Sequence, residues 1–324
     1  MYPSIAGDRA DVAEIGGRWE EGSPSRPRCG KGGGPEGRDD GSRALVRATI
    51  FLLPHPDDEY FFAPWIARTA AAGTEVYCVF TTDGTAYGAD PQTRMRESAQ
   101  ALERLGVPEE QLLFPGVQCG IRDGRSHERM EIILESVREA TSPLSIGTIY
   151  VPAWEGGNVD HDAAHLVGAA LGPALGVSRI YECPMYHCHR TAYPWFHVMR
   201  LISRPPRSSK GRNGSPPPST DGRHVVSLGP REAWQYFRLM RRFRSQWRSF
   251  AGLAPGAFLR IVVERRFTRR PLPRIDYTRR PHAGPLFYEK RAGIPFERFH
   301  ATTAPFVTAR ISGATMERLT HARG

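Results

Sequence analysis

Lysine is scarce in this chain of 324 residues, and long apolar runs are absent. Only three of the 44 basic residues are lysine, namely Lys31, Lys210 and Lys290. The net charge of +10 therefore rests almost entirely on arginine, a bias typical of genome-wide codon usage. No apolar run approaches the roughly 20 residues that a membrane-spanning helix requires. Residues 1–43 also lack the apolar segment of a secretory signal, so we expect neither a membrane span nor export.

Cysteine is also infrequent, and its spacing carries no motif. The chain has five cysteines, an odd number, and no two of them form a Cys-x-x-Cys pair. A disulfide framework normally uses an even set of cysteines in an exported protein. We therefore expect reduced thiols and a cytoplasmic location. The five residues are Cys29, Cys78, Cys119, Cys183 and Cys188.

Composition divides the chain into five segments. Residues 1–43 are rich in glycine, arginine, proline and serine, which predicts a disordered leader. A folded core is expected over 44–203, followed by a proline-rich flexible linker over 204–222. Residues 223–300 are expected to form a helical cap that packs on the core, and residues 301–324 a loose C-terminus.

Strand and helix patterns alternate within the core, which predicts a mostly parallel sheet with helices on both faces. The expected strands are 47–53, 75–81, 112–114, 147–152 and 179–184. The expected helices are 59–72, 92–105, 126–140 and 162–175.

The first chemically informative cluster follows the first expected strand. An apolar run ends at Leu53, and Pro54 then leads into His55, Asp57 and Asp58. In open α/β sheets, ligands bind beyond the carboxyl ends of the strands, where this cluster falls. A histidine and two carboxylates could supply two metal ligands and one base. An ordinary solvated turn or helix cap is the alternative interpretation.

A second cluster follows the fourth expected strand. There, Asp160, His161, Asp162 and His165 occupy another junction between a strand and a helix. Neighbouring parallel strands would bring the two clusters to the same edge of the sheet. His161 and His165 lie four residues apart, so on a helix either one could complete a metal site with His55.

The two clusters together resemble a known family, the PIG-L/LmbE-like zinc deacetylases. Residues 54–59, Pro-His-Pro-Asp-Asp-Glu, match the family signature, and 158–161, Asn-Val-Asp-His, stand where the family usually has His-Pro-Asp-His. Residues 81–84, Arg94 and Glu97 also match. The resemblance covers roughly 45–190, and it implies a Rossmann-like three-layer sandwich that removes N-acetyl groups from amino sugars such as N-acetylglucosamine.

The resemblance also implies a role for each matching residue. His55, Asp58 and His161 would hold Zn²⁺ or another divalent metal, and Asp57 would act as the general base. Asp160 would orient a histidine ligand. The matches at Asp83, Arg94 and Glu97, together with Tyr186 and His187 after the fifth expected strand, are expected to contact the substrate.

One position departs from the family pattern. Asn158 stands where the family has a histidine that stabilises an oxyanion or donates a proton. An amide can donate a hydrogen bond, but it cannot deliver a proton at neutral pH. Either Asp57 carries the proton alone, or His165, His187 or His189 replaces the missing group.

Several functions remain open from the sequence alone. The leading hypothesis is a deacetylase acting on an N-acetylated amino sugar. The same site could instead serve an amidase that removes a larger N-acyl group. A catalytically weak binder of carbohydrate or lipid headgroups is a further alternative, because Asn158 replaces the usual histidine.

The C-terminal part of the chain is strongly basic. Residues 223–300 hold 18 arginines or lysines against five carboxylates, and the spacing over 234–250 predicts one amphipathic helix flanked by arginines. A solvated helix that packs on the core is the plain interpretation. The alternative is attraction to an anionic lipid or a diphosphate-linked carrier, which would bring the protein to a membrane surface. No nucleic-acid-binding motif accompanies the charge, so we expect no nucleic acid partner.

Overall fold

The computed structural model describes residues 47–85, 88–191, 193–202 and 222–311. The expected leader and all of the expected linker except Gly222 lie outside these residues. Within them, the four cysteines are free thiols. None of the helices in these ranges is long and apolar enough to cross a membrane.

A seven-stranded mixed sheet organises the described residues, in the order β3-β2-β1-β4-β5-β9-β8. The first five strands of this order are parallel to one another. β9 then pairs antiparallel with both β5 and β8. This confirms the expected Rossmann-like, mostly parallel sheet. The strands are β1 (Ala48–Leu53), β2 (Val76–Phe80), β3 (Leu112–Leu113), β4 (Ile146–Pro152), β5 (Ile180–Cys183), β8 (His224–Ser227) and β9 (Arg266–Pro271).

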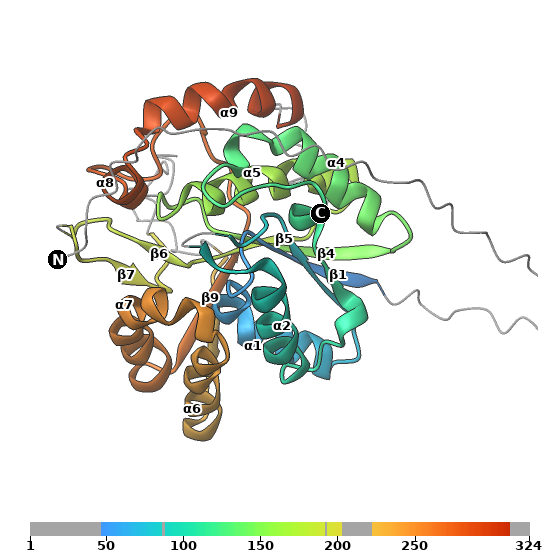
Figure 1. Cartoon of the computed structure of the whole chain (residues 1–324), viewed down its shortest axis with the longest axis vertical. Helices are drawn as coiled ribbons and strands as arrows, with labels where there is room; N and C mark the ends of the chain where they lie inside the picture. The colour runs from blue at the N-terminus through green and yellow to red at the C-terminus, as the bar shows by residue number, and fades with distance from the viewer. Residues whose placement is uncertain (1–46, 86–87, 192, 203–221, 312–324) are drawn as a thin grey trace, which may run out of the picture. The chain divides into compact units, whose positions relative to one another are not determined.

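Helices cover both faces of the sheet (Figure 1). One face carries α1 (Glu59–Ala71) and α2 (Pro91–Glu103), and the other carries α4 (Met130–Thr141), α5 (Val159–Ala174) and α9 (Phe296–Arg310). The shorter elements are α3 (Pro115–Gln118), α8 (Phe287–Ala292) and a separate ribbon formed by β6 (Tyr186–His187) and β7 (His197–Val198).

Strand β1 lies inside the sheet between β2 and β4, and every one of its side chains is buried. Phe51 and Leu53 belong to the apolar core beneath α1 and α2, whereas Ile50 and Leu52 belong to the core beneath α4 and α5. Alternate side chains of a strand point to opposite faces, so a continuous apolar run fits a strand covered on both sides. The order of the strands then makes β1 and β4 neighbours.

Two helices begin at residues other than those expected. Helix α5 begins at Val159 rather than at 162, because the Asn158 side chain caps it by accepting a hydrogen bond from the Asp160 amide at 2.8 Å. Helix α4 begins at Met130, because residues 126–128 form a separate 3₁₀ turn. Asp160 and His161 therefore lie in the first turn of a helix and not in a loop.

The C-terminal part is not the single amphipathic helix expected over 234–250. Helix α6 (Pro230–Leu239) is separated from α7 (Trp247–Ala257) by two 3₁₀ turns. The chain turns there because the buried Phe243 ring stacks on Phe250, with centroids 5.2 Å apart. Residues 301–310 were expected to be loose but form the end of α9, whose Phe306 is buried.

The close approach of α5 to β4 generates a prediction about stability. A Cβ atom added at Gly168 would lie 2.2 Å from Cγ1 of Val151, so Gly168→Ala forces the helix and strand apart. We expect a loss of about 1–3 kcal/mol in the free energy of unfolding, measured by denaturant titration. The double variant Gly168→Ala/Val151→Ala should lose less than the sum of the two single variants. Additive losses would contradict this contact.

Candidate metal centre

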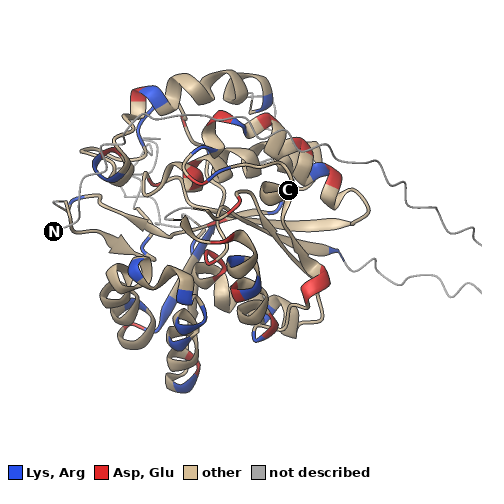
Figure 2. Ribbon diagram, viewed as in Figure 1, with Lys and Arg blue, Asp and Glu red and all other residues tan. Residues whose placement is uncertain are grey.

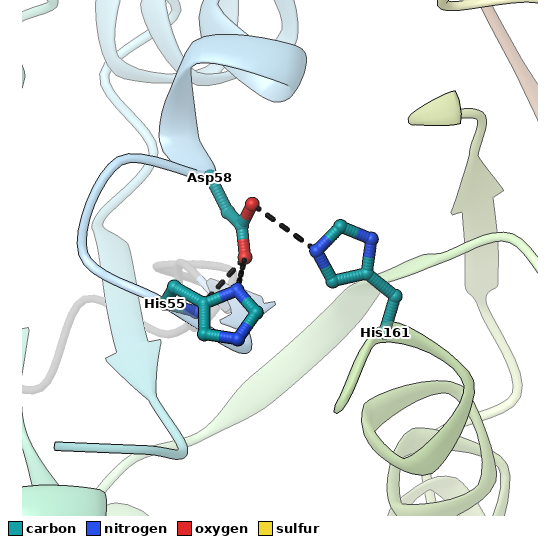
Figure 3. A group of neighbouring side chains, drawn as sticks. All are labelled: His55, Asp58 and His161. Atoms are coloured by element: carbon teal, nitrogen blue, oxygen red, sulfur yellow. Dashed lines mark hydrogen bonds and ion pairs between the residues drawn. The ribbon is translucent and has the colours of Figure 1, made fainter. Parts of the chain in front are cut away.

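Three potential metal ligands meet where β1 and β4 lie side by side (Figure 3). His55 and Asp58 follow the end of β1, and His161 projects from the first turn of α5, which follows β4. The chain after β1 goes to one side of the sheet, and β4 lies on the other. Such a switch point leaves a crevice beyond the strand ends, which is the usual ligand site of open α/β sheets.

The potential ligand atoms lie close enough together to share one metal ion. His55 Nδ1 lies 3.0 Å from Asp58 Oδ2, and His161 Nε2 lies 3.4 Å from Asp58 Oδ1. One atom from each residue falls within 4.8 Å of the others. Zinc bonds of about 2.0–2.1 Å place neighbouring tetrahedral ligands about 3.3 Å apart. Two imidazoles and one carboxylate therefore fit a divalent metal and leave a coordination position open.

Asp160 fixes the orientation of the His55 ring. The Nε2–H of His55 donates to Oδ2 of Asp160 at 3.0 Å, which turns Nδ1 toward Asp58. Asp160 is fully buried and is itself held by the loop before α4: the amides of Gly124 and Ser126 and the Ser126 hydroxyl donate to it. Ligating histidines commonly donate their second ring nitrogen to a carboxylate in this way.

The surroundings of His55 favour a positive charge. Burial alone would lower the pKa of His55, but the carboxylates of Asp123 and Asp58 raise it well above its usual value, with help from Asp160. A carboxylate accepts hydrogen bonds and donates none, so a hydrogen or a metal ion must lie between each ring nitrogen and its carboxylate neighbour. At Nδ1 that position can be taken by a proton or by a metal ion.

Asp57 lies beside this group on a constrained turn. Its φ angle of 130° is rarely adopted by residues other than glycine. The Glu59 carboxylate accepts a hydrogen bond from the Asp57 amide at 2.9 Å, and the Arg94 guanidinium lies 3.1 Å from Asp57 Oδ2. Burial raises the pKa of Asp57 to about 7 in the metal-free protein, against the opposing effect of Arg94. Its side chain remains 15% exposed, so the carboxylate can be reached.

Arg94 lies under the turn rather than on the open side of the site. Its side chain is 3% exposed and donates to the carbonyl oxygens of Pro56 and Gly84 at 2.5 and 2.6 Å. It also forms ion pairs with Asp57 and Asp123. This placement does not support the expected substrate contact. A buried guanidinium with these partners fixes the conformation of the turn.

Two further residues expected to contact substrate have partners within the protein. Glu97 accepts hydrogen bonds from the Ser245 amide and hydroxyl at 2.9 and 2.7 Å, which ties α2 to the C-terminal segment. Asp83 accepts from the amide and hydroxyl of Thr85 at 3.0 and 2.8 Å. A substrate role for either residue stays a prediction.

Tyr186 borders the metal ligands, whereas His187 does not. The Tyr186 ring lies edge-on to His161 with centroids 5.1 Å apart, and its hydroxyl shares a hydrogen bond with Asn158. His187 points elsewhere and donates from Nε2 to the Arg200 carbonyl at 2.7 Å. Burial lowers the pKa of His187 to about 3, so its ring is neutral at physiological pH.

The other histidines that could replace the family histidine at position 158 also have partners within the protein. His165 is fully buried one helical turn beyond His161, where Nδ1 lies 2.8 Å from the Pro152 carbonyl and Nε2 lies 3.0 Å from the Tyr277 hydroxyl. It is neither the third ligand nor a nearby donor. His189 packs against the rings of His187 and His282.

Three supporting residues escaped prediction. Asp123, Gly124 and Ser126 come from the loop that precedes α4. Asp123 accepts hydrogen bonds from the Thr82 hydroxyl at 2.6 Å and the Gly84 amide at 3.0 Å, and with His55 and Asp160 it forms a second acidic group. No spacing in the sequence links this loop to His55, because the contacts exist only after folding.

The Asp160 contact generates a prediction about metal affinity. In Asp160→Asn, the side chain keeps its shape but loses the charge that orients His55, so the affinity for Zn²⁺ should fall about 10–100-fold. Competition with a chromogenic chelator would measure it. Asp162→Asn is the matched control, because Asp162 is also buried in α5 but accepts from the amides of Glu155 and Gly156. An equal loss in both variants would contradict a specific role for Asp160.

Comparison with solved structures supports the fold. A crystal structure described as a deacetylase–bog complex in the biosynthesis pathway of teicoplanin has a TM-score of 0.51 and 17% identity, covering 71% of this chain and 99% of that chain. A structure described as the zinc inhibited form of teicoplanin deacetylase has a TM-score of 0.50 and 16% identity, with the same coverage. At these identities the similarity concerns the fold.

Comparison with protein families identifies the part of the chain that holds the site. No curated protein matches the chain. Residues 50–171 match the family model PIG-L, described as GlcNAc-PI de-N-acetylase, and this range includes His55, Asp58 and His161. Residues 50–171 of this chain are therefore a PIG-L family domain.

Proposed function

We propose that this protein is a metal-dependent deacetylase that removes the acetyl group from an N-acetylated amino sugar. The observation that carries the proposal is the meeting of His55, Asp58 and His161 beside the reachable carboxylate of Asp57, within a PIG-L domain. The deacetylase descriptions of the similar structures agree with this reaction class.

The proposed metal is zinc, because two imidazoles and a carboxylate are the donor types of hydrolytic zinc sites. When bound, zinc polarises the acetyl carbonyl and lowers the pKa of a coordinated water. His55 and His161 contribute neutral nitrogen donors, and Asp58 contributes the single negative charge. Asp160 keeps His55 turned so that Nδ1 faces the ligand position.

Asp57 is proposed to move the proton. Its carboxylate takes a proton from water as the water oxygen attacks the carbonyl carbon of the acetamide. The bond between that carbon and the sugar nitrogen then breaks, and the same proton passes to the nitrogen to release an amine and acetate. Arg94 and Glu59 hold Asp57 at the required position by fixing its side chain and its amide.

Asn158 is proposed to serve the acetyl oxygen and not the leaving group. Its side-chain oxygen accepts from the Asp160 amide, so its NH₂ group is directed away from the helix. Tyr186 shares a hydrogen bond with it, and burial raises the pKa of Tyr186 to about 12, so the hydroxyl keeps its proton. Because His165 and His187 are engaged elsewhere and His189 packs against His187 and His282, we propose that Asp57 carries the proton alone.

The identity of the acyl group and of the carrier is a finer part of the proposal. The same residues could serve an amidase that removes a larger N-acyl group, and the departure at Asn158 keeps a weakly catalytic binder as the second candidate. An anionic lipid or diphosphate carrier is proposed as a partner of the basic C-terminal region, on the strength of its charge.

Acetate release tests the reaction class. The full chain loaded with one equivalent of Zn²⁺ should release acetate from at least one of a panel of N-acetylglucosaminyl lipids, nucleotide-linked N-acetyl sugars and N-acetylglucosaminyl inositols. Chelation should abolish release, and added Zn²⁺ should restore it. Stoichiometric metal without release from any member would favour the binder.

Substitution of Asp57 separates proton transfer from metal binding. Asp57→Asn preserves the size of the side chain but removes its basicity, so kcat should fall about 10²–10⁴-fold while metal stoichiometry is unchanged. Asp90→Asn is the matched control, because Asp90 is exposed, caps α2 through Thr93 and should change kcat far less. A modest loss of activity in Asp57→Asn would refute its role as the base.

Substitution of Asn158 by histidine tests whether the asparagine supports catalysis or impairs it. If the amide serves the acetyl oxygen as proposed, Asn158→His should lower kcat because the helix cap and the Tyr186 contact are lost together. Thermal unfolding of the variant would show the separate cost of the cap, about 1 kcal/mol. A large gain in kcat would instead mean that the natural site is impaired and would favour the binder.

A further inference from the structure

Large apolar side chains are exposed together on the segment that follows β8. Trp247 is 63% exposed, Trp234 is 47% exposed and Phe258 is 41% exposed. Leu259 and Val263 on the following π-helical turn (Phe258–Val263) are also exposed. Exposed apolar groups concentrated in one region usually mark an interaction surface.

A groove of about 580 Å³ runs across this segment, between α6 and α7. Phe243 and Phe250 lie among its lining residues, and both rings are buried and stacked on each other. Its edges include Trp234 and Trp247 together with arginines, namely Arg238, Arg241 and Arg244. We call this groove and its edges the aromatic–arginine face.

The charge of the aromatic–arginine face is almost entirely positive. Residues 230–263 contain seven arginines and a single carboxylate, Glu232. Arg238, Arg241 and Arg244 are exposed, and in the part of the chain that the structure describes none of them forms an ion pair with a carboxylate. Basic residues lie on α6, at the start of α7 and on the turns between the two helices, whereas α4 and α9 together carry both signs in similar numbers (Figure 2).

The combination of these features identifies the kind of partner. Tryptophan is the residue that proteins place at the level of lipid headgroups, because its ring is apolar and its N–H is polar. Arginine binds phosphate oxygens with two parallel hydrogen bonds. A groove that offers apolar walls between unpaired guanidinium groups therefore suits an amphiphile with an anionic head and an acyl chain.

We propose that the aromatic–arginine face docks on the surface of an anionic phospholipid bilayer. Trp234 and Trp247 would sit at headgroup depth, and Arg238, Arg241 and Arg244 would contact lipid phosphates. Helices α6 and α7 are too short to span a bilayer, so the protein lies on the surface.

The aromatic–arginine face is attached firmly to the domain that holds the metal centre. Phe250 in the groove packs edge-on against Tyr60 of α1, with centroids 5.5 Å apart, and Tyr60 is two residues after Asp58. Ser245 is bonded to Glu97 of α2. Docking would therefore hold the metal centre in one orientation to the membrane, where a lipid-linked substrate would be presented.

Vesicle sedimentation of the full chain tests the proposal directly. We expect binding to phosphatidylcholine vesicles that contain 30% phosphatidylglycerol, little binding to pure phosphatidylcholine, and weakening as salt is raised. Arg238→Glu/Arg241→Glu should weaken partitioning by at least about 30-fold, because each basic residue near an anionic surface contributes about fivefold. Trp247→Ala should weaken the binding that remains at high salt.

Arg129→Glu/Arg298→Glu is the matched control. Both arginines are exposed; Arg129 directly precedes α4 and Arg298 belongs to α9, and these helices cover the face of the sheet opposite to α1 and α2. The control makes the same change in net charge and should bind vesicles nearly as well as the natural protein. An equal loss in both double variants would overturn the proposal, as would equal binding to neutral vesicles. Binding to a short DNA duplex but not to vesicles would also overturn it. Thermal unfolding of each variant confirms that the fold is retained, and vesicle binding is independent of deacetylation.

Discussion

The carboxylate of Asp160 joins three segments that are far apart in the sequence. It accepts from His55 after β1, from the amides of Gly124 and Ser126 in the loop before α4, and it stands in the first turn of α5. Because the side chain is fully buried, each of these contacts must be present for its charge to be tolerated. The direction of the His55 ring, and with it the geometry of the candidate metal centre, depends on this one group.

The rest of the site shows how a cluster of acidic groups can be kept in a folded protein. Asp57, Asp58, Asp123 and Asp160 crowd around His55, and the pKa of Asp58 is lowered by its histidine neighbours despite its burial. Arg94 offsets part of this charge and fixes the turn that gives Asp57 its unusual backbone. Strain at functional residues persists when the surroundings impose it. A bound divalent cation would neutralise much of the remaining charge.

Much of the fold could be predicted because its local signals agree with the tertiary structure. Strands buried on both faces are continuous apolar runs, so the five parallel strands were placed to within two residues. The meeting of His55 with His161 or His165 could also be expected, since the two clusters follow neighbouring strands, and the family resemblance selected His161. Asn158 directly before an apolar helix was a readable cap, although its consequence, an earlier start of α5, was missed.

What escaped prediction depends on contacts between distant segments. Arg94 and Glu97 match the family pattern, but only the folded chain shows that one supports the Asp57 turn and the other anchors Ser245. The break between α6 and α7 arises because Phe243 turns inward to stack on Phe250. A helical periodicity cannot reveal that, because apolar residues recur at the same spacing in one helix or in two that fold together.

X-ray absorption spectroscopy of the zinc-loaded protein would show whether His55, Asp58 and His161 hold one metal ion. We expect one zinc with nitrogen and oxygen neighbours at about 2.0–2.1 Å. We also expect imidazole scattering from two rings, of which one is lost in His161→Ala. Sulfur neighbours, or a spectrum that is unchanged by His161→Ala, would rule out this set of ligands.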